Sequence, residues 1–181
     1  MEELQDKMWN HCSLPDIFNS IKRGKRHKKG DHTQGSVPYV SSTESNNGVD
    51  SFIEAKKGTR SFENCISLAN SGSVGAAFYE PFEFVASDHV TSLQKVDASP
   101  SEYLFLATSI MKQRKNFDFN REINESRVNK MQVMLPVSEN GEPDYAFMEN
   151  YVSEMRGGLS CVIKPSSKPN LQNWNTLRSQ L

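Results

Sequence analysis

The side chains of this sequence that could do chemistry are cations and side-chain amides gathered in a few short segments. Residues 22 to 29, KRGKRHKK, hold six Lys or Arg and no acid, and residues 112 to 130 hold six basic and three acidic residues among aromatics and amides. The formal net charge of the whole chain is only -1, so the remainder is acidic. One such run alone is more often a solvated loop, but two of them on an acidic body favour a nucleic-acid partner.

Two polar loops contain groups that could read bases or hold phosphate. SSTESNN, residues 41 to 47, carries amides that can pair with adenine and hydroxyls that can contact phosphates. NSGSVG, residues 70 to 75, has glycines that let a backbone approach a phosphate or simply turn a corner. From the residues alone, a solvated loop fits SSTESNN equally well, and a turn is the simpler interpretation of NSGSVG.

Catalytic motifs are weak by comparison. Glu54-Ala55-Lys56 matches the tripeptide of Mg²⁺-dependent PD-(D/E)xK nucleases, with Asp31 or Asp50 as the upstream carboxylate, but such triplets are common by chance. The neighbours Asp88-His89 do not make a catalytic triad by adjacency. The chain has no Walker A loop, GxSxG elbow or HExxH helix.

Methyl transfer and metal binding are also poorly supported. Glu80-Pro81-Phe82 is the nearest string to the Asn/Asp-Pro-Pro-aromatic loop of a DNA amino-methyltransferase, with one proline and the wrong acid. Cys12, Cys65 and Cys161 are widely spaced, which argues against a disulfide framework and suits a reducing cytoplasm. His11-Cys12 has no second pair at metal-binding spacing. We therefore expect no catalysis, no metal, no cofactor and no membrane span in this chain.

The elements that must position these segments follow from the hydrophobic pattern. The first 12 residues mix apolar and polar positions in a way that predicts a short amphipathic helix. Between Ile17 and about Val96, turn residues separate short runs that predict a sheet: IFNSI, VPYVSS, VDSFIEA, NCISLA, GAAFYE and FEFVAS. Asn47-Gly48 lies between the second and third runs and favours a hairpin there.

Helices are predicted in the second half of the chain. Ser99, Pro100 and Glu102 form a capping box with proline at the first helical position, and an apolar face with a basic end follows. MQVMLPV, residues 131 to 137, predicts a strand. A further helix is predicted over residues 143 to 156, with an apolar face that suits the core or a partner helix. Pro, Ser and Asn throughout residues 157 to 181 indicate a loosely ordered tail.

In their order and spacing these segments resemble a known family. The runs are RGKR, GSVPYVSSTESNNGV, NCISLANSGSVGAAFYEPFEFVASDHV, EYLFLATSIMKQRKNFDFNREINESRVNKMQVMLPV and GEPDYAFMENYV. They resemble a target recognition domain of the DNA-specificity (S) subunits of type I restriction-modification systems, most of all the Bcg-like type IIB specificity subunits. The likeness covers roughly residues 14 to 155. It implies an α+β domain with a curved, mostly antiparallel sheet and flanking helices, whose loops enter the major groove.

Together with the pattern, the resemblance predicts four segments and a set of DNA contacts. The segments are an N-terminal helical segment (1 to 13), a DNA target recognition domain (14 to 142), a dimerisation or spacer helix (143 to 156) and a tail (157 to 181). The residues that the resemblance places near DNA are Arg23, Lys25, Arg26, Lys28, Lys29, Tyr39, Ser41, Ser42, Thr43, Asn46, Asn47, Ser71, Ser73, Lys112, Arg114, Lys115 and Arg121.

The resemblance also implies that catalysis resides in partner methyltransferase and endonuclease subunits. Specificity subunits usually hold two recognition domains joined by long helices, whereas this chain has one. We therefore expect a cytoplasmic specificity subunit that recognises double-stranded DNA sequence-specifically. The single domain fits either a half-subunit that pairs with a second copy or a remnant that has lost its partner interactions. The alternatives are a Mg²⁺-dependent nuclease and a protein-interaction adaptor that uses the apolar face of residues 145 to 155 without binding DNA.

Overall fold

The computed structural model describes residues 3–28, 30, 32–117 and 122–162. The elements in chain order are η1 (Leu4–Asp6), β1 (Met8–Ser13), α1 (Leu14–Ile17), β2 (Ser20–Arg23), β3 (Gln34–Val40), η3 (Ser45–Gly48), β4 (Val49–Ile53), β5 (Ser61–Phe62), β6 (Cys65–Ala69), β7 (Ala77–Glu80), β8 (Phe84–Ala86), β9 (Val90–Gln94), α2 (Pro100–Met111), η4 (Lys112–Asn116), α3 (Glu125–Val128), β10 (Gln132–Val137) and α4 (Tyr145–Val162).

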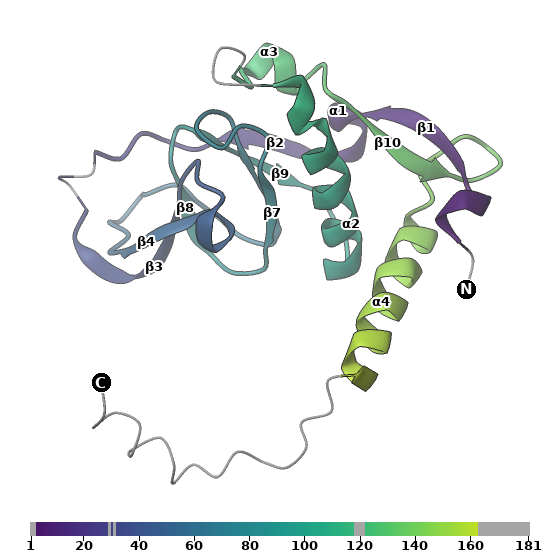
Figure 1. Ribbon diagram of the computed structural model, residues 1–181. Coiled ribbons are helices and arrows are strands. Elements are labelled where there is room, and N and C mark those ends of the chain that lie inside the picture. Colours follow the sequence, from purple (N-terminus) through teal and green to yellow (C-terminus); the bar gives the residue numbers. More distant parts are fainter. Residues whose placement is uncertain (1–2, 29, 31, 118–121, 163–181) are drawn as a thin grey trace, which may run out of the picture.

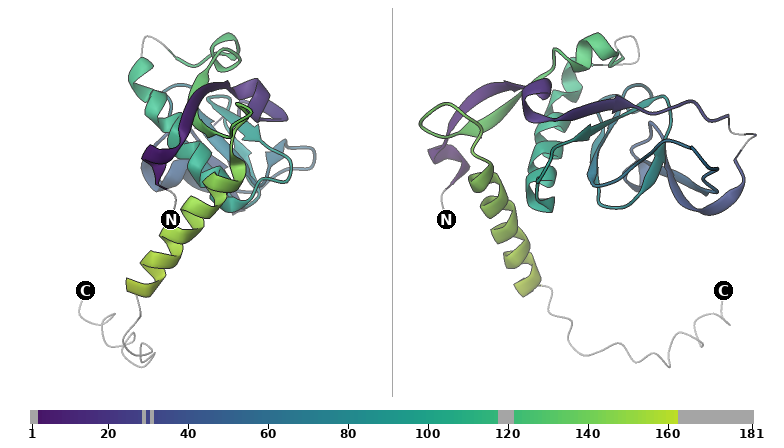
Figure 2. Two further views of the ribbon diagram at one scale, coloured as in Figure 1. Left: turned by 90° about the vertical axis from the view of Figure 1, so that its right-hand side faces the viewer. Right: turned by 180° about the vertical axis from the view of Figure 1, so that it is seen from behind.

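Within the described residues the strands form three sheets, ordered β1-β10, β2-β9-β6-β7 and β4-β3-β8-β5. The pairing is antiparallel apart from β3 with β8, which run parallel. In Figure 1, α2 lies between the two four-stranded sheets on one side and β1, β10 and α4 on the other, and Figure 2 shows the same arrangement from two further sides. The expected α+β class with mostly antiparallel pairing is confirmed.

The main core lies where the β2-β9-β6-β7 sheet faces α2. Ile66 and Leu93 from the sheet, Leu106 from α2 and Met148 from α4 are all buried in one cluster. Burial of such side chains contributes about 1.5–3 kcal/mol each. Two smaller apolar clusters lie under the β4-β3-β8-β5 sheet. The strands that carry the polar loops therefore pack at the end of the molecule away from α4 (Figure 1).

The first residues form a strand instead of the predicted helix. Apart from the short turn η1, the segment pairs as β1 with β10, with Met8 opposite Val137 and Ser13 opposite Gln132. The helix prediction for residues 1 to 13 is therefore wrong. Local periodicity could not reveal this strand, because its partner lies more than a hundred residues away and tertiary pairing overrides weak propensity.

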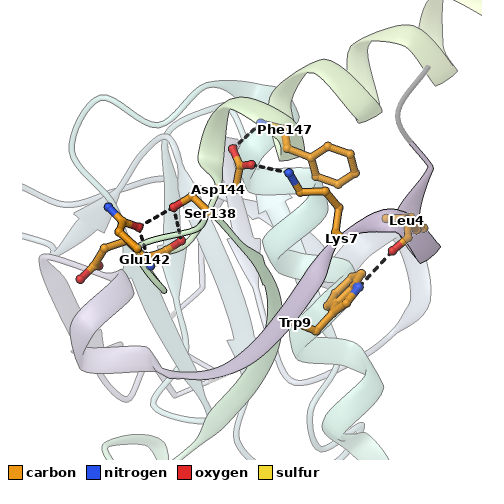
Figure 3. Close-up of polar contacts among 8 residues, drawn as sticks. Leu4, Lys7, Trp9, Ser138, Glu142, Asp144 and Phe147 are labelled. Carbon is orange, nitrogen blue, oxygen red and sulfur yellow. Dashed lines mark hydrogen bonds and ion pairs between the residues drawn. The ribbon is translucent and has the colours of Figure 1, made fainter.

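A polar clamp joins this N-terminal strand region to the start of α4 (Figure 3). Lys7 Nζ donates to Asp144 Oδ2 at 2.7 Å and lies 4.8 Å from the centre of the Phe147 ring. Asp144 Oδ1 accepts from the Phe147 backbone N–H at 3.0 Å, so the carboxylate also caps the helix. The Lys7 ammonium holds the pKa of Asp144 below its usual range.

The middle of the chain follows the predictions with specific departures. Strands are present in each predicted run, although the first begins at Ser20, after the short helix α1. The strand β9 was not expected because its sequence, VTSLQ, places two hydroxyl residues side by side. Thr91 and Ser92 are both buried, so the segment shows neither the alternation of a half-buried strand nor the continuous apolar run of a fully buried one. β5 and α3 are two further unpredicted elements. The capping box of α2 is confirmed, with Ser99 Oγ accepting from Glu102 N–H at 3.2 Å and Glu102 Oε2 accepting from Ser99 N–H at 2.7 Å.

The last helix begins two residues later and ends later than predicted. It runs from Tyr145 to Val162, through the two glycines at 157 and 158. A single glycine costs a helix about 1 kcal/mol, which is too little to end one that is already growing. The predicted tail is therefore wrong for residues 157 to 162, and the remainder of it lies outside the described residues.

Candidate nucleic-acid interface

Three predicted contact segments, far apart in sequence, meet in the fold. The Ser73 N–H donates to the Ser42 carbonyl at 3.0 Å, which joins the turn at residues 70–75 to the loop at residues 41–47. The Glu44 carboxylate of that loop pairs with the Arg114 guanidinium of η4 at 2.7 Å. The structure therefore brings the polar loop, the glycine-containing turn and the basic end of α2 into one surface.

The loop at residues 41–47 is a tight connection between β3 and β4, as Asn47-Gly48 predicted. The Ser41 N–H donates to the Gly48 carbonyl at 2.9 Å and closes the loop. Asn46 and Asn47 have left-handed backbones, with φ of 50° and 53°, which asparagine tolerates better than most residues. Both are exposed, and no hydrogen bond joins their amides to other described residues. These amides are free to pair with an external ligand.

The basic segment leaves the end of β2 and runs beside β8. The Gly24 N–H donates to the Val90 carbonyl at 2.9 Å and the Lys25 N–H to the Ala86 carbonyl at 3.3 Å. A Cβ at Gly24 would lie 2.1 Å from the Ser87 carbonyl oxygen, so only glycine allows this approach. Lys25, Arg26 and Lys28 are exposed, and Lys29 lies outside the described residues.

The basic segment and the start of the polar loop border one cavity of about 520 Å³. Its lining residues are Arg26, His27, Lys28, His32, Tyr39, Ser41, Ser42, Asp50, Ser87, Asp88 and His89. Cations, hydroxyls, imidazoles and carboxylates together supply both donors and acceptors, the mixture that base edges and phosphates require.

Tyr39, which was predicted to contact DNA, is part of the wall of this cavity and is buried. Its ring lies 4.5 Å from the His32 ring and 6.2 Å from the His27 ring, both in edge contacts. Burial raises the pKa of Tyr39, as does the Asp88 carboxylate, and a hydrogen bond with Ser87 lowers it. The Tyr39 ring therefore packs against His27 and His32 inside the cavity wall and exposes little surface for a DNA contact.

Ser71 is also buried, and its hydroxyl is already engaged. Ser71 Oγ and His89 Nδ1 are 2.8 Å apart, and the neighbouring Asn70 N–H donates to the His89 carbonyl at 2.8 Å. Arg23 Nε donates to the Asp88 carbonyl beside this pair. Sequence reasoning missed His27, His32, Asp50, Ser87, Asp88 and His89 as members of the site. Only the three-dimensional pairing of β3 with β8 brings them together.

The other predicted residues divide between surface and undescribed positions. Lys112 and Lys115 are exposed on η4, while Ser42, Thr43 and Ser73 are half-buried. Arg121 lies outside the described residues.

The candidate nuclease residues do not share one site. Glu54 and Lys56 border a separate cavity of about 330 Å³, whereas Asp50 borders the cavity at Tyr39, and Asp31 lies outside the described residues. In the described part of the chain, no group of three or more His, Cys, Asp or Glu side chains is arranged to hold a metal ion. Among the helices described, none is long and apolar enough to cross a membrane.

A family model described as the type I restriction modification DNA specificity domain matches residues 6–164. The specificity subunit of the type II restriction enzyme BcgI from Heyndrickxia coagulans is 32% identical over 158 residues, which cover 86% of this chain and 46% of that protein.

Solved structures show the same fold at low sequence identity. The S subunit of a type I restriction-modification system from M. genitalium superposes with a TM-score of 0.64 and 16% identity, covering 88% of this chain and 42% of that one. The HsdS subunit from Thermoanaerobacter tengcongensis gives 0.58 and 10%, covering 89% and 40%. The chain therefore spans less than half the length of each of these relatives.

Proposed function

This chain belongs to the family of type I restriction-modification DNA specificity domains, and we propose that it recognises a specific double-stranded DNA sequence as a specificity subunit or half-subunit. In this function it directs a partner methyltransferase and endonuclease to their target and is not itself an enzyme. We also propose that it works in the cytoplasm.

The observation that carries the proposal is that cations and the start of the loop with the unpaired amides border one cavity. Exposed Arg26 and Lys28 border the cavity that also takes in the start of the polar loop. That loop exposes the Asn46 and Asn47 amides in left-handed conformations that cost backbone energy. Cations supply sequence-independent attraction to phosphates, and amides supply the paired donor and acceptor that discriminate bases.

A selection of bound sequences from random duplexes tests the proposal, followed by two substitutions. Asn46→Gly and Asn47→Gly keep the left-handed backbone accessible and remove only the amide. Loss of a bidentate amide contact costs about 1–3 kcal/mol of discrimination, so one base position of the selected site should become degenerate. Asn140→Gly, in an exposed turn away from the loop, is the control.

Failure to enrich any duplex sequence with the wild-type chain would contradict the proposed function. If both glycine variants enrich the same sequence as the wild type, the chain recognises DNA without base contacts from the Asn46 and Asn47 amides.

We propose further that the α4 region pairs with a second copy of the chain, as expected for a half-subunit. A groove of about 570 Å³ lies between α2 and α4 and is lined largely by apolar side chains, including Leu104, Phe105 and Met155. Leu104 is 37% and Met155 is 49% exposed.

Light scattering of the purified chain tests this pairing. We expect a dimer that Leu104→Lys together with Met155→Lys converts to a monomer. Met8→Lys, which changes an exposed apolar residue of β1 outside the groove, should leave the dimer intact. A wild-type chain that remains monomeric at all accessible concentrations would contradict pairing without affecting DNA recognition.

A further inference from the structure

Arg114 was predicted to contact DNA, yet its charge is already engaged. Its Nη2 atom lies 2.7 Å from Glu44 Oε2, and the pair joins the middle of η4 to the middle of the polar loop. Glu44 is seventy residues away in sequence. One other acid lies near Glu44 in the described part of the chain: Asp50, on the strand β4 that follows the loop. Unlike Glu44, Asp50 has no ion-pair partner within the described residues.

The stem of Arg114 is held by close packing. A Cβ placed on Gly75 would lie 2.9 Å from Arg114 Cγ and 3.3 Å from Arg114 Cα. Gly75 also has a φ of +78°, which disfavours any side chain at this position. The turn that contains Gly75 is bonded in turn to the loop through Ser73 and Ser42. The stem of Arg114 is therefore held beside Gly75, and its guanidinium reaches Glu44.

Glu44 needs an explanation of its own on this surface. A carboxylate that faces a polyanion repels it, so an unpaired Glu44 would weaken binding to every DNA sequence. Pairing with Arg114 cancels that charge, and it fixes the loop at a third point beyond the closing bond of Ser41 and the bond from Ser73. Ordering a loop before it binds reduces the entropy lost on binding.

We infer that Arg114 is a positioning residue, which acts through Glu44 to hold the loop at residues 41–47 in its reading conformation, and that it is not a phosphate ligand. The inference rests on the proposed function. It separates the basic end of α2 into two roles, because exposed Lys115 on the same short helix has no ion-pair partner within the described residues and is free to attract phosphate.

The test measures binding of the selected duplex and of a scrambled duplex over a range of salt concentrations. Arg114→Met keeps the aliphatic stem beside Gly75 and removes the charge. The variant is combined with Glu44→Gln, so that no unpaired carboxylate faces the DNA. We expect this double variant to weaken the selected duplex about three- to five-fold, the effect of an exposed ion pair, with scrambled-duplex binding and the salt slope unchanged. Lys115→Met is the matched control and should weaken both duplexes and lower the salt slope by about 0.9.

A reversed pair, Glu44→Arg with Arg114→Glu, gives the second readout. It should restore binding of the selected duplex to within about two-fold, because the pair is re-formed with opposite polarity. Arg114→Glu alone, which leaves two carboxylates facing each other and the DNA, should weaken it. If the double variant Arg114→Met with Glu44→Gln instead lowers binding to both duplexes and lowers the salt slope as Lys115→Met does, Arg114 is a phosphate ligand and the inference is overturned. A wild-type chain without preference for the selected duplex would contradict the proposed function itself.

Discussion

Glu80 provides a test of the fold that is independent of DNA. It lies on β7, is only 1% exposed, and accepts a hydrogen bond at Oε1 from Ser67 Oγ at 2.9 Å. Burial raises the pKa of Glu80 from its ordinary 4.5 to about 7, against the opposing effect of the Ser67 hydrogen bond. This is the same residue that begins the imperfect Glu-Pro-Phe string. In the fold it is an internal acid and not a base-binding loop.

The sign and size of the effect follow from linkage. The folded chain holds this proton more tightly than the unfolded chain, so the free energy of unfolding is highest below pH 4.5 and falls as pH rises to about 7. A shift of that size corresponds to about 3 kcal/mol in full. Between about pH 5 and about pH 8 the loss is about 2.5 kcal/mol. Glu80→Gln removes this loss and keeps an oxygen for Ser67.

The assay is urea unfolding of the wild type and of Glu80→Gln at several pH values, with Glu83→Gln as an exposed control. Between about pH 5 and about pH 8, the free energy of unfolding of Glu80→Gln should rise by about 2.5 kcal/mol relative to that of the wild type, because only the wild type must ionise a buried carboxyl. Other titrating groups cancel in the difference. Parallel stability curves for the two chains would refute the argument and show that Glu80 is solvated in the folded chain.

Three further predictions concern the surfaces that position the site. Gly24→Ala should destabilise the chain by several kcal/mol in thermal unfolding, since its Cβ would collide with the Ser87 carbonyl, whereas Gly157→Ala, in open helix, should stabilise it by about 0.5–1 kcal/mol. Asp144→Ala should cost about 1–2 kcal/mol at neutral pH through the lost cap and ion pair, and the cost should shrink as pH falls below about 4, because the folded pKa of Asp144 is lowered. The basic run is tested by replacing Lys25, Arg26, Lys28 and Lys29 together by Gln. In binding titrations at varied salt, this variant should bind all duplexes more weakly, and its salt slope should be lower by roughly 3 to 4. An unchanged slope would exclude the run from the interface.

Local signals in the sequence predicted the elements that depend on local bonds. The Ser99–Glu102 capping box and the Asn47-Gly48 connection are both present, because each is formed by residues within four positions of one another. The strand β1 was missed because its hydrogen-bond partners lie in β10. The strand β9 was missed because its polar residues are buried beside long-range partners: Thr91 Oγ1 donates to Asn70 Oδ1 and Ser92 Oγ donates to Cys65 Sγ.

The candidate site divides along the same line. Which residues carry cations and amides is visible in the sequence, so the basic run and SSTESNN could be named without a structure. Which of them are free to contact a ligand depends on long-range neighbours: Ser71 is engaged by His89 and Arg114 by Glu44, whereas the Asn46 amide has no partner in the described part of the chain. A basic or hydroxyl side chain therefore marks a candidate contact only until its three-dimensional neighbours are known. On this surface the unpaired Asn46 and Asn47 amides, held between engaged neighbours, are the groups best placed to carry sequence information.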